Sequence, residues 1–203
     1  MAAELKDHFF KEIQSYKSPP PREVAPVPAV GEPAREHAES VLKLPKDKPT
    51  IIVFLRHCGC PFAEKAFRAL TAFSTRHAGS IHCIAISHSS REHTEAWVPQ
   101  VGGEWNVEVI VDEEREIYAA WGLGLSSYWH VGPMSFFNAM QLGKSEGIWN
   151  RTTESGTKWQ TGGAFAVDRA GKVRWVSVAK TASDVPDLNA ALRALLEAPT
   201  EVS

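Results

Sequence analysis

The chain has 203 residues, of which 43% are hydrophobic and 23% charged, with a formal net charge of -2 at pH 7. A chain of this length can bury roughly two-thirds of the surface that its unfolded form exposes, so packing alone can sustain its core. The near balance of 22 basic and 24 acidic residues excludes the basic excess of a nucleic-acid binder, and no stretch reaches the ~20 apolar residues of a membrane span. We therefore expect neither nucleic acid nor a membrane as a partner. Three cysteines are too few for a disulfide framework, which favours a cytoplasmic protein in a reducing compartment.

The first 34 residues differ in composition from the rest. Residues 3–16 place Leu5, Phe9 and Ile13 at helical spacing with charged residues on the other side, which predicts a short amphipathic helix. Residues 18–33 contain six prolines, too many fixed φ angles and missing amide donors for a regular element. This Pro-rich arm is expected to act as a connector or a strap across the surface, with a recruitment motif as the alternative. The division predicted is an N-terminal helix and arm at 1–34 and one domain at 35–203.

The middle of the chain alternates between strand and helix patterns. Continuous apolar, β-branched runs are typical of strands buried on both faces, and apolar stripes at a period of 3.6 are typical of helices. The strands are expected over residues 50–55, 81–87 and 107–111, and the helices over residues 61–77, 91–101 and 113–121. Strands that alternate with helices predict parallel crossovers.

The C-terminal part has a different pattern. Residues 164–167 and 173–178 flank a turn-forming loop at 168–172, which predicts an antiparallel hairpin, and residues 184–196 carry a helical apolar stripe. The expected fold is therefore α/β, with a thioredoxin-like mixed sheet of three parallel strands plus an antiparallel C-terminal hairpin and with helices on both faces.

A Gly- and Trp-rich insertion spans residues 122–163, with one helix expected at 133–142. A long aromatic connection inside a compact domain is usually a functional loop or a covering flap. Two interpretations remain open for its aromatic residues: they complete the core, or they form the wall or lid of a pocket. The residues concerned include Trp129, Trp149, Phe136 and Phe137.

The end of the first predicted strand carries the candidate catalytic residues. Pro61 suits the first position of a helix, which places Cys60 at or next to the N-cap, beside free N–H groups and the positive end of the helix dipole. Arg56 and His57 add positive potential, and surroundings of this kind increase the thiolate fraction of a cysteine. Cys60 is therefore the candidate nucleophile.

The other two cysteines have weaker signals. In an extended chain the sulfurs of Cys58 and Cys60 share one face, and a disulfide between them closes a small, strained and easily reduced ring. Cys58 is thus either the partner of Cys60 in a transient oxidised form or a core residue. Cys83 lies inside a predicted strand and is expected to pack in the core.

Metal and cofactor sites are not predicted. The Cys58-Gly59-Cys60 spacing lacks the two-residue gap of zinc sites, and no second pair of ligands follows it. The scattered histidines are assigned to helix or loop surfaces without a function: His77, His88, His93 and His130.

The run Val-Phe-Leu-Arg-His-Cys-Gly-Cys-Pro-Phe at residues 53–62 resembles the motif of the peroxiredoxin-like proteins of the AhpC/TSA superfamily, which have a thioredoxin-like fold. Residues 121–124, 162–168 and 171–173 resemble later parts of the same family pattern, so the similarity extends over about residues 49–196. The resemblance implies that Cys60 is the peroxidatic cysteine, whose thiolate attacks a peroxide to give a sulfenic acid.

Four positions depart from the family pattern. The second cysteine of the motif is Ala63 here, and Cys58 stands where the family often has phenylalanine. His57 replaces the usual threonine, and Gly162 occupies the stretch in which the family places an arginine. Under the resemblance, Cys58 is a candidate displaced resolving cysteine and Arg56 a candidate substitute for the missing charge.

Three functions remain open. The first is a thiol-dependent oxidoreductase that reduces hydroperoxides or disulfides through Cys60, with Cys58 or an external thiol as resolving group. The second is a repurposed enzyme that acts on an apolar or aromatic small molecule under residues 122–163, and the third is a non-catalytic redox sensor or binding module. The expected partners are a small-molecule substrate, a thiol reductant and a second copy of the chain, and no cofactor is required.

Overall fold

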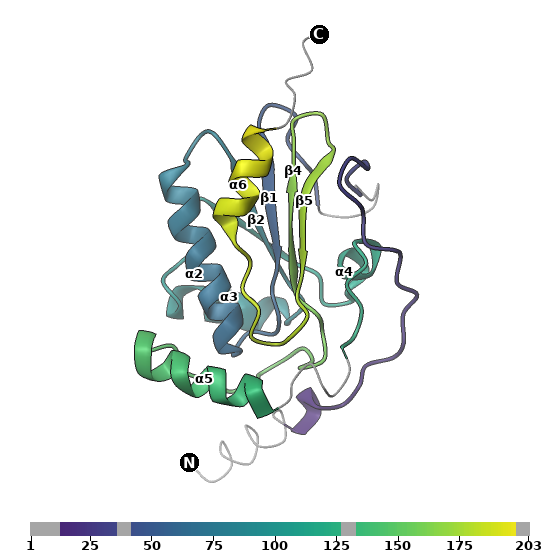
Figure 1. Ribbon diagram of the computed structural model, residues 1–203. Helices are drawn as coiled ribbons and strands as arrows, with labels where there is room; N and C mark the ends of the chain where they lie inside the picture. Colours follow the sequence, from purple (N-terminus) through teal and green to yellow (C-terminus); the bar gives the residue numbers. More distant parts are fainter. Residues whose placement is uncertain (1–12, 36–41, 127–132, 198–203) are drawn as a thin grey trace.

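A computed structural model describes residues 13–35, 42–126 and 133–197. It contains a five-stranded sheet in the order β3-β2-β1-β4-β5 (Figure 1). β1, β2 and β3 are parallel, and β4 and β5 form an antiparallel hairpin next to β1, which confirms the predicted fold class. In chain order the elements are β1 (Thr50–Phe54), α2 (Pro61–Arg76), β2 (His82–Ser87), α3 (Arg91–Gln100), β3 (Val107–Val111), α4 (Glu116–Ala120), α5 (Pro133–Glu146), β4 (Gly163–Val167), β5 (Val173–Val178) and α6 (Leu188–Leu196).

The central strand β1 is buried on both faces, as its apolar sequence predicts. Ile51 and Val53 point into a cluster with α2, α3 and α6 on one face, and Ile52 and Phe54 point into a cluster with α4 on the other. Helices therefore cover both faces of the sheet (Figure 1). None of the helices in the described ranges is long and apolar enough to cross a membrane.

Tyr118 of α4 fixes the strand ends next to the candidate site. Its buried hydroxyl lies 2.5 Å from the carbonyl oxygen of Leu55 and 2.7 Å from that of Ile86, immediately after β1 and within β2. The Asp112 carboxylate accepts hydrogen bonds from the N–H groups of Ile117 and Tyr118 and so satisfies the first turn of α4. The end of β1 is thus held by α4, which lies on the face of the sheet opposite to α2.

Two helices begin later than the sequence predicts. Arg115 has a left-handed conformation with φ 59°, which a helix cannot include, so α4 begins at Glu116. Residues 184–187 precede α6 because Asp187 is its N-cap and accepts hydrogen bonds from the N–H groups of Asn189 and Ala190. Pro186 also keeps the preceding residue out of the helical region.

The Pro-rich arm lies along the surface without helix or strand of its own. Ala25 N–H donates to the carbonyl of Ala119, and Gly31 N–H donates to that of Val173. A Cβ at Gly122 would lie 2.6 Å from the backbone of Val27, so only glycine permits this approach. The arm is a strap from the insertion to the edge of β5. Most of the predicted N-terminal helix falls on residues 1–12, outside the described residues, while residues 13–15 are helical.

Candidate active site

Cys60 is the N-cap residue of α2, as the sequence predicts. Pro61 occupies the first helical position, and the carbonyl of Cys60 accepts the N–H of Glu64 at 3.0 Å. Cys60 is only 3% exposed and lies next to the positive end of the helix dipole, which stabilises a negative charge at this position.

The guanidinium of Arg56 reaches the sulfur of Cys60. Its Nη1 donates to Sγ at 3.4 Å, and its Nη2 donates to the carbonyl oxygen of Lys158 at 2.5 Å. Gly162 provides the room for this arrangement, because a Cβ there would lie 2.9 Å from the carbonyl oxygen of Phe54 and 3.4 Å from Cγ of Arg56. Arg56 is thus held by the insertion in position to stabilise a thiolate at Cys60.

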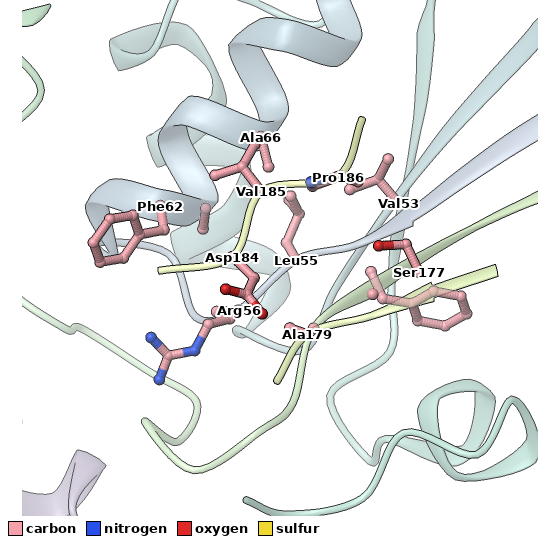
Figure 2. Close-up of a pocket in the computed structure, with 14 residues that line it drawn as sticks. Val53, Leu55, Arg56, Phe62, Ala66, Ser177, Ala179, Asp184, Val185 and Pro186 are labelled. Carbon is pink, nitrogen blue, oxygen red and sulfur yellow. The ribbon is translucent and has the colours of Figure 1, made fainter. Parts of the chain in front are cut away.

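A small hollow of about 30 Å³ lies behind Arg56, between the end of β1, α2 and residues 184–186. Figure 2 shows the aliphatic part of Arg56 beside this hollow and its guanidinium pointing away from it. The hollow has about the volume of one water molecule, so it is too small for a substrate.

The imidazole of His57 is directed away from the candidate nucleophile in its hydrogen bonding. Its Nδ1 lies 3.2 Å from the carbonyl oxygen of Cys58 and 3.4 Å from Oγ1 of Thr153. The backbone carbonyl of His57 accepts the N–H of Cys60 at 3.1 Å, but among the described residues no hydrogen bond joins the ring to the sulfur of Cys60. The pKa of His57 is held well below its usual value, mainly because the ring is buried and secondly because it lies near the positive charge of Arg56. The ring is therefore neutral near pH 7. It links the cysteine loop, which is formed by residues 55–60 between β1 and α2, to Thr153 of the insertion.

The side chain of Cys58 has different surroundings from that of Cys60. Its Sγ lies 3.6 Å from Oγ of Ser87 and 3.8 Å from Oγ1 of Thr94. Burial raises the pKa of the Cys58 thiol above its ordinary value. The extended conformation considered for Cys58-Gly59-Cys60 is wrong, because residues 58–59 form a turn with φ +103° at Gly59.

The insertion clamps this turn. The N–H of Arg151 donates to the carbonyl of Gly59, and a Cβ at Gly59 would lie 2.8 Å from the carbonyl oxygen of Thr152. The buried carboxylate of Glu64 pairs with Arg151 at 3.0 Å and with Arg68 at 2.5 Å. The first turn of α2 and the cysteine loop are therefore fixed to residues 151–152.

A cavity of about 410 Å³ opens beside Cys60, and this volume suits a small organic molecule. The ammonium of Lys158 lies 4.1 Å from the centre of the Tyr16 ring at this cavity. The polar or ionisable residues that line the cavity are Arg56, His57, Cys60, Ser135, Asn150 and Lys158. The apolar and aromatic residues that line it are Tyr16, Pro61, Phe62, Phe136, Ala139, Met140, Trp149 and Ala182.

Three aromatic residues of the insertion, Phe136, Phe137 and Trp149, lie outside the hydrophobic core. Phe136 is 71% exposed, Phe137 63% and Trp149 53%, so the core interpretation is wrong for these three. Phe136 and Trp149 instead belong to the cavity wall, as the other interpretation has it. Trp149 lies against Gly143, where a Cβ would meet its ring at 2.4 Å. Trp129 lies outside the described residues.

His88 is buried, whereas the sequence predicts a surface position for it. It is 2% exposed, and its Nε2 lies 3.1 and 3.2 Å from the backbone oxygen and nitrogen of Thr157. It is buried because residues 155–157 of the insertion cover the end of β2. Burial lowers the pKa of His88 to about 4, so the side chain is neutral near pH 7.

The buried His88 predicts that the protein loses stability in mild acid. Its folded pKa of about 4 lies below the unfolded value near 6.5, so the unfolded chain binds more protons between these values and stability falls as pH decreases through this window. We expect a loss of about 2 kcal/mol from His88 between pH 7 and pH 5, and His57 acts in the same direction. Urea unfolding at the two pH values measures it. The His88→Gln variant should show a smaller difference than His77→Gln, and equal differences would contradict the assignment.

Two residues of the site were not identified from the sequence. Glu64 lies four residues after Cys60 in the first turn of α2. The sequence feature that could have identified it is an acidic residue at this spacing inside an apolar helix pattern. Lys158 contributes its carbonyl oxygen and its ammonium, and nothing in the local sequence indicates either role. Cys83 is buried in β2, as expected, and the described residues include no cluster of three side chains suited to a metal ion.

Comparison with known proteins identifies relatives of the fold. The family model described as AhpC/TSA antioxidant enzyme matches residues 68–181. A peroxiredoxin-like protein from Aquifex aeolicus is similar in structure with a TM-score of 0.60 at 16% identity, over 88% of this chain and 92% of that chain. A mutant of peroxiredoxin 6 from Arenicola marina is similar with a TM-score of 0.53 at 12% identity, over 73% of this chain and 60% of that chain.

These similarities show a common fold with a thioredoxin-like sheet. A search of the curated proteins gave no match. The matched family segment begins after Cys60 and includes neither Arg56 nor Cys60.

Proposed function

Because the chain belongs to the AhpC/TSA antioxidant enzyme family, we propose that it is a thiol peroxidase that reduces hydroperoxides through Cys60. One observation carries this proposal: Nη1 of Arg56 donates to Sγ of Cys60, at 3.4 Å, at the N-terminus of α2. The guanidinium and the helix N-terminus both favour the thiolate, which is the reactive form of a cysteine. The cavity beside Cys60 admits a substrate to the same sulfur.

The reaction follows from this geometry. The Cys60 thiolate attacks the terminal oxygen of the hydroperoxide, an S–O bond forms and the O–O bond breaks. The sulfur loses two electrons and becomes a sulfenic acid, and the other oxygen takes a proton from solvent and leaves as an alcohol. Arg56 can stabilise both the attacking thiolate and the negative charge that develops on the leaving oxygen.

An external thiol is the resolving group that the surroundings favour. Cys58 stays protonated because burial raises its pKa, and residues 151–152 hold Gly59 in the turn that separates the two cysteines. A small thiol that enters the cavity condenses with the sulfenic acid to give a mixed disulfide and water. A second thiol then releases Cys60 as a thiol and leaves as the oxidised disulfide.

The proposal is tested by hydroperoxide consumption with a small thiol such as glutathione as the only reductant. We expect turnover by the full chain above the background of thiol alone, and we expect the Cys58→Ser variant to keep most of it, because serine can form the same bonds to Ser87 and Thr94. The Cys83→Ala variant controls for the loss of a thiol elsewhere. No turnover by the wild type would contradict the proposed activity, and loss of turnover only in Cys58→Ser would assign resolution to Cys58.

A second candidate function is the binding of an apolar small molecule without thiol chemistry. The exposed positions of Phe136 and Trp149 at the cavity favour it. It predicts that apolar ligands quench tryptophan fluorescence in wild type and equally in a Cys60→Ser variant. The Pro-rich arm gives less support to a recruitment function, because it is bound to the fold at Ala119, Gly122 and Val173.

A further inference from the structure

The two ring nitrogens of His57 have different roles. Nδ1 is the nitrogen that contacts the carbonyl oxygen of Cys58, at 3.2 Å. A carbonyl oxygen only accepts hydrogen bonds, so Nδ1 carries the hydrogen of the neutral ring and Nε2 carries the lone pair. Burial, and secondly the positive charge of Arg56, hold the pKa of His57 well below its usual value. Nε2 is therefore a hydrogen-bond acceptor near pH 7.

Nε2 of His57 opens onto the cavity beside Cys60. His57 is only 3% exposed, and it lines this cavity. Among the residues that the structure describes, no hydrogen bond reaches Nε2. The described side-chain nitrogens that are both unpaired and fully enclosed are Nε of Arg56, Nδ1 of His88 and Nε1 of Trp97. Nε2 of His57 is not one of them, so this acceptor reaches the surface of the cavity.

The backbone brings this acceptor close to the nucleophile. The N–H of Cys60 donates to the carbonyl of His57 at 3.1 Å. Residues 57–60 thus form a turn, and the first and last Cα atoms of such a turn lie within about 7 Å of each other. Nη1 of Arg56 donates to the sulfur from the same loop, and a guanidinium offers donors only. The cavity therefore presents one donor and one acceptor beside a single nucleophilic sulfur.

An organic hydroperoxide matches these groups. Its terminal oxygen, which the thiolate attacks, carries one O–H donor, and its second oxygen is an acceptor. Phe136, Met140 and Trp149 make part of the cavity wall apolar. The cavity of about 410 Å³ is also much larger than hydrogen peroxide requires, since a water molecule takes about 30 Å³. The room and the apolar wall suit a hydroperoxide that carries an apolar organic group.

We propose that His57 is a catalytic residue whose Nε2 accepts the O–H of the terminal oxygen of an organic hydroperoxide, while the apolar group of the substrate lies against Phe136, Met140 and Trp149. This inference rests on the proposed peroxidase function. The hydrogen stays on the terminal oxygen while the S–O bond forms and the O–O bond breaks. The sulfur loses two electrons, and the leaving oxygen gains them and takes a proton from solvent. His57 orients the attacked oxygen and then accepts the O–H of the sulfenic acid.

The test compares two reagents that react with the same sulfur. Cumene hydroperoxide has an O–H donor, whereas dithiodipyridine, a disulfide, has none. Loss of one hydrogen bond between neutral groups changes a rate constant by roughly 3- to 10-fold. His57→Leu should therefore lower the ratio of the cumene hydroperoxide rate constant to the dithiodipyridine rate constant at Cys60 by this factor. His57→Gln should keep a ratio close to that of the wild type, because its amide oxygen is an acceptor.

The matched control is His88→Leu. It removes a similarly buried imidazole, whose Nε2 contacts the backbone of Thr157, and its ratio should equal that of the wild type. If wild type reacts with cumene hydroperoxide and His57→Leu has an unchanged ratio, this inference alone is overturned. If Cys60 of the wild type reacts with dithiodipyridine but not with cumene hydroperoxide, the proposed function is overturned and this inference with it.

Two measurements on the wild type need no variant. Long-range nitrogen-15 NMR identifies the ring nitrogen of His57 that carries the hydrogen, and we expect Nδ1 at pH 7. A hydrogen on Nε2 would overturn the inference, because that nitrogen could not accept the substrate O–H. We also expect cumene hydroperoxide to react roughly tenfold faster than hydrogen peroxide, because its phenyl ring buries apolar surface in the cavity. An equal or faster reaction with hydrogen peroxide would overturn the substrate class.

Discussion

Replacement of Cys60 by serine is expected to abolish hydroperoxide reduction. A serine hydroxyl is not ionised near neutral pH and cannot be oxidised to a sulfenic acid, so the loss should be at least ~100-fold, to the background of the thiol alone. Consumption of tert-butyl hydroperoxide with a small thiol measures it. The fold should tolerate the change, because serine is a favoured N-cap residue and Cys60 is the N-cap of α2.

The matched control is Cys58→Ser, which makes the same substitution two residues earlier in the same loop. It should retain turnover, as the external-thiol mechanism requires. If Cys60→Ser kept its activity while Cys58→Ser lost it, the nucleophile would be Cys58, and the assignment made from the end of β1 would be wrong.

Removal of the Arg56 guanidinium has the second largest expected effect. A hydrogen bond to a charged group contributes about 1.5–3 kcal/mol, so Arg56→Met should lower the rate constant for reaction with hydroperoxide by roughly 10- to 100-fold. The cause is loss of the 3.4 Å contact to Sγ of Cys60. Stopped-flow measurement of one turnover gives this rate constant without the resolving step.

Arg56→Lys is the control that keeps the charge. A lysine ammonium cannot reproduce the planar, two-donor geometry by which Arg56 contacts both Cys60 and the carbonyl of Lys158. Its rate constant should therefore lie between those of wild type and Arg56→Met. An unchanged rate constant in Arg56→Met, with an unchanged melting temperature, would show that the guanidinium does not act on the reaction.

The sheet could be predicted from the sequence because its strands carry strong local signals. Every residue of 50–55 is either apolar or β-branched, and residues 168–172 have turn chemistry between two short strands. The predicted starts of α4 and α6 were less accurate, because they depend on the left-handed conformation of Arg115 and on the capping carboxylate of Asp187. Backbone features of this kind leave little trace in an apolar pattern.

The position of Cys60 could also be predicted, since a buried strand followed by Cys-Pro locates the sulfur at a helix N-terminus. The contact from Arg56 could be suggested but not established, because it depends on the carbonyl of Lys158, 102 residues away in the chain. His88 was assigned to the surface for a related reason: it follows a strand, and it is covered by residues 156–157 and by the ring of Tyr118, both distant in the sequence. Long-range contacts with the insertion therefore contribute to the position of the Arg56 guanidinium and to the burial of His88.

The central claim is that Cys60 is the residue that hydroperoxide oxidises. It is tested most directly when the reduced full chain receives one equivalent of hydroperoxide in the presence of a dimedone-type trap, with all three cysteines followed by mass spectrometry. We predict that the sulfenic acid adduct forms on Cys60 and that Cys58 and Cys83 stay unmodified. Consumption of the hydroperoxide with the adduct on Cys58 or Cys83, or no adduct on any cysteine, would contradict the account.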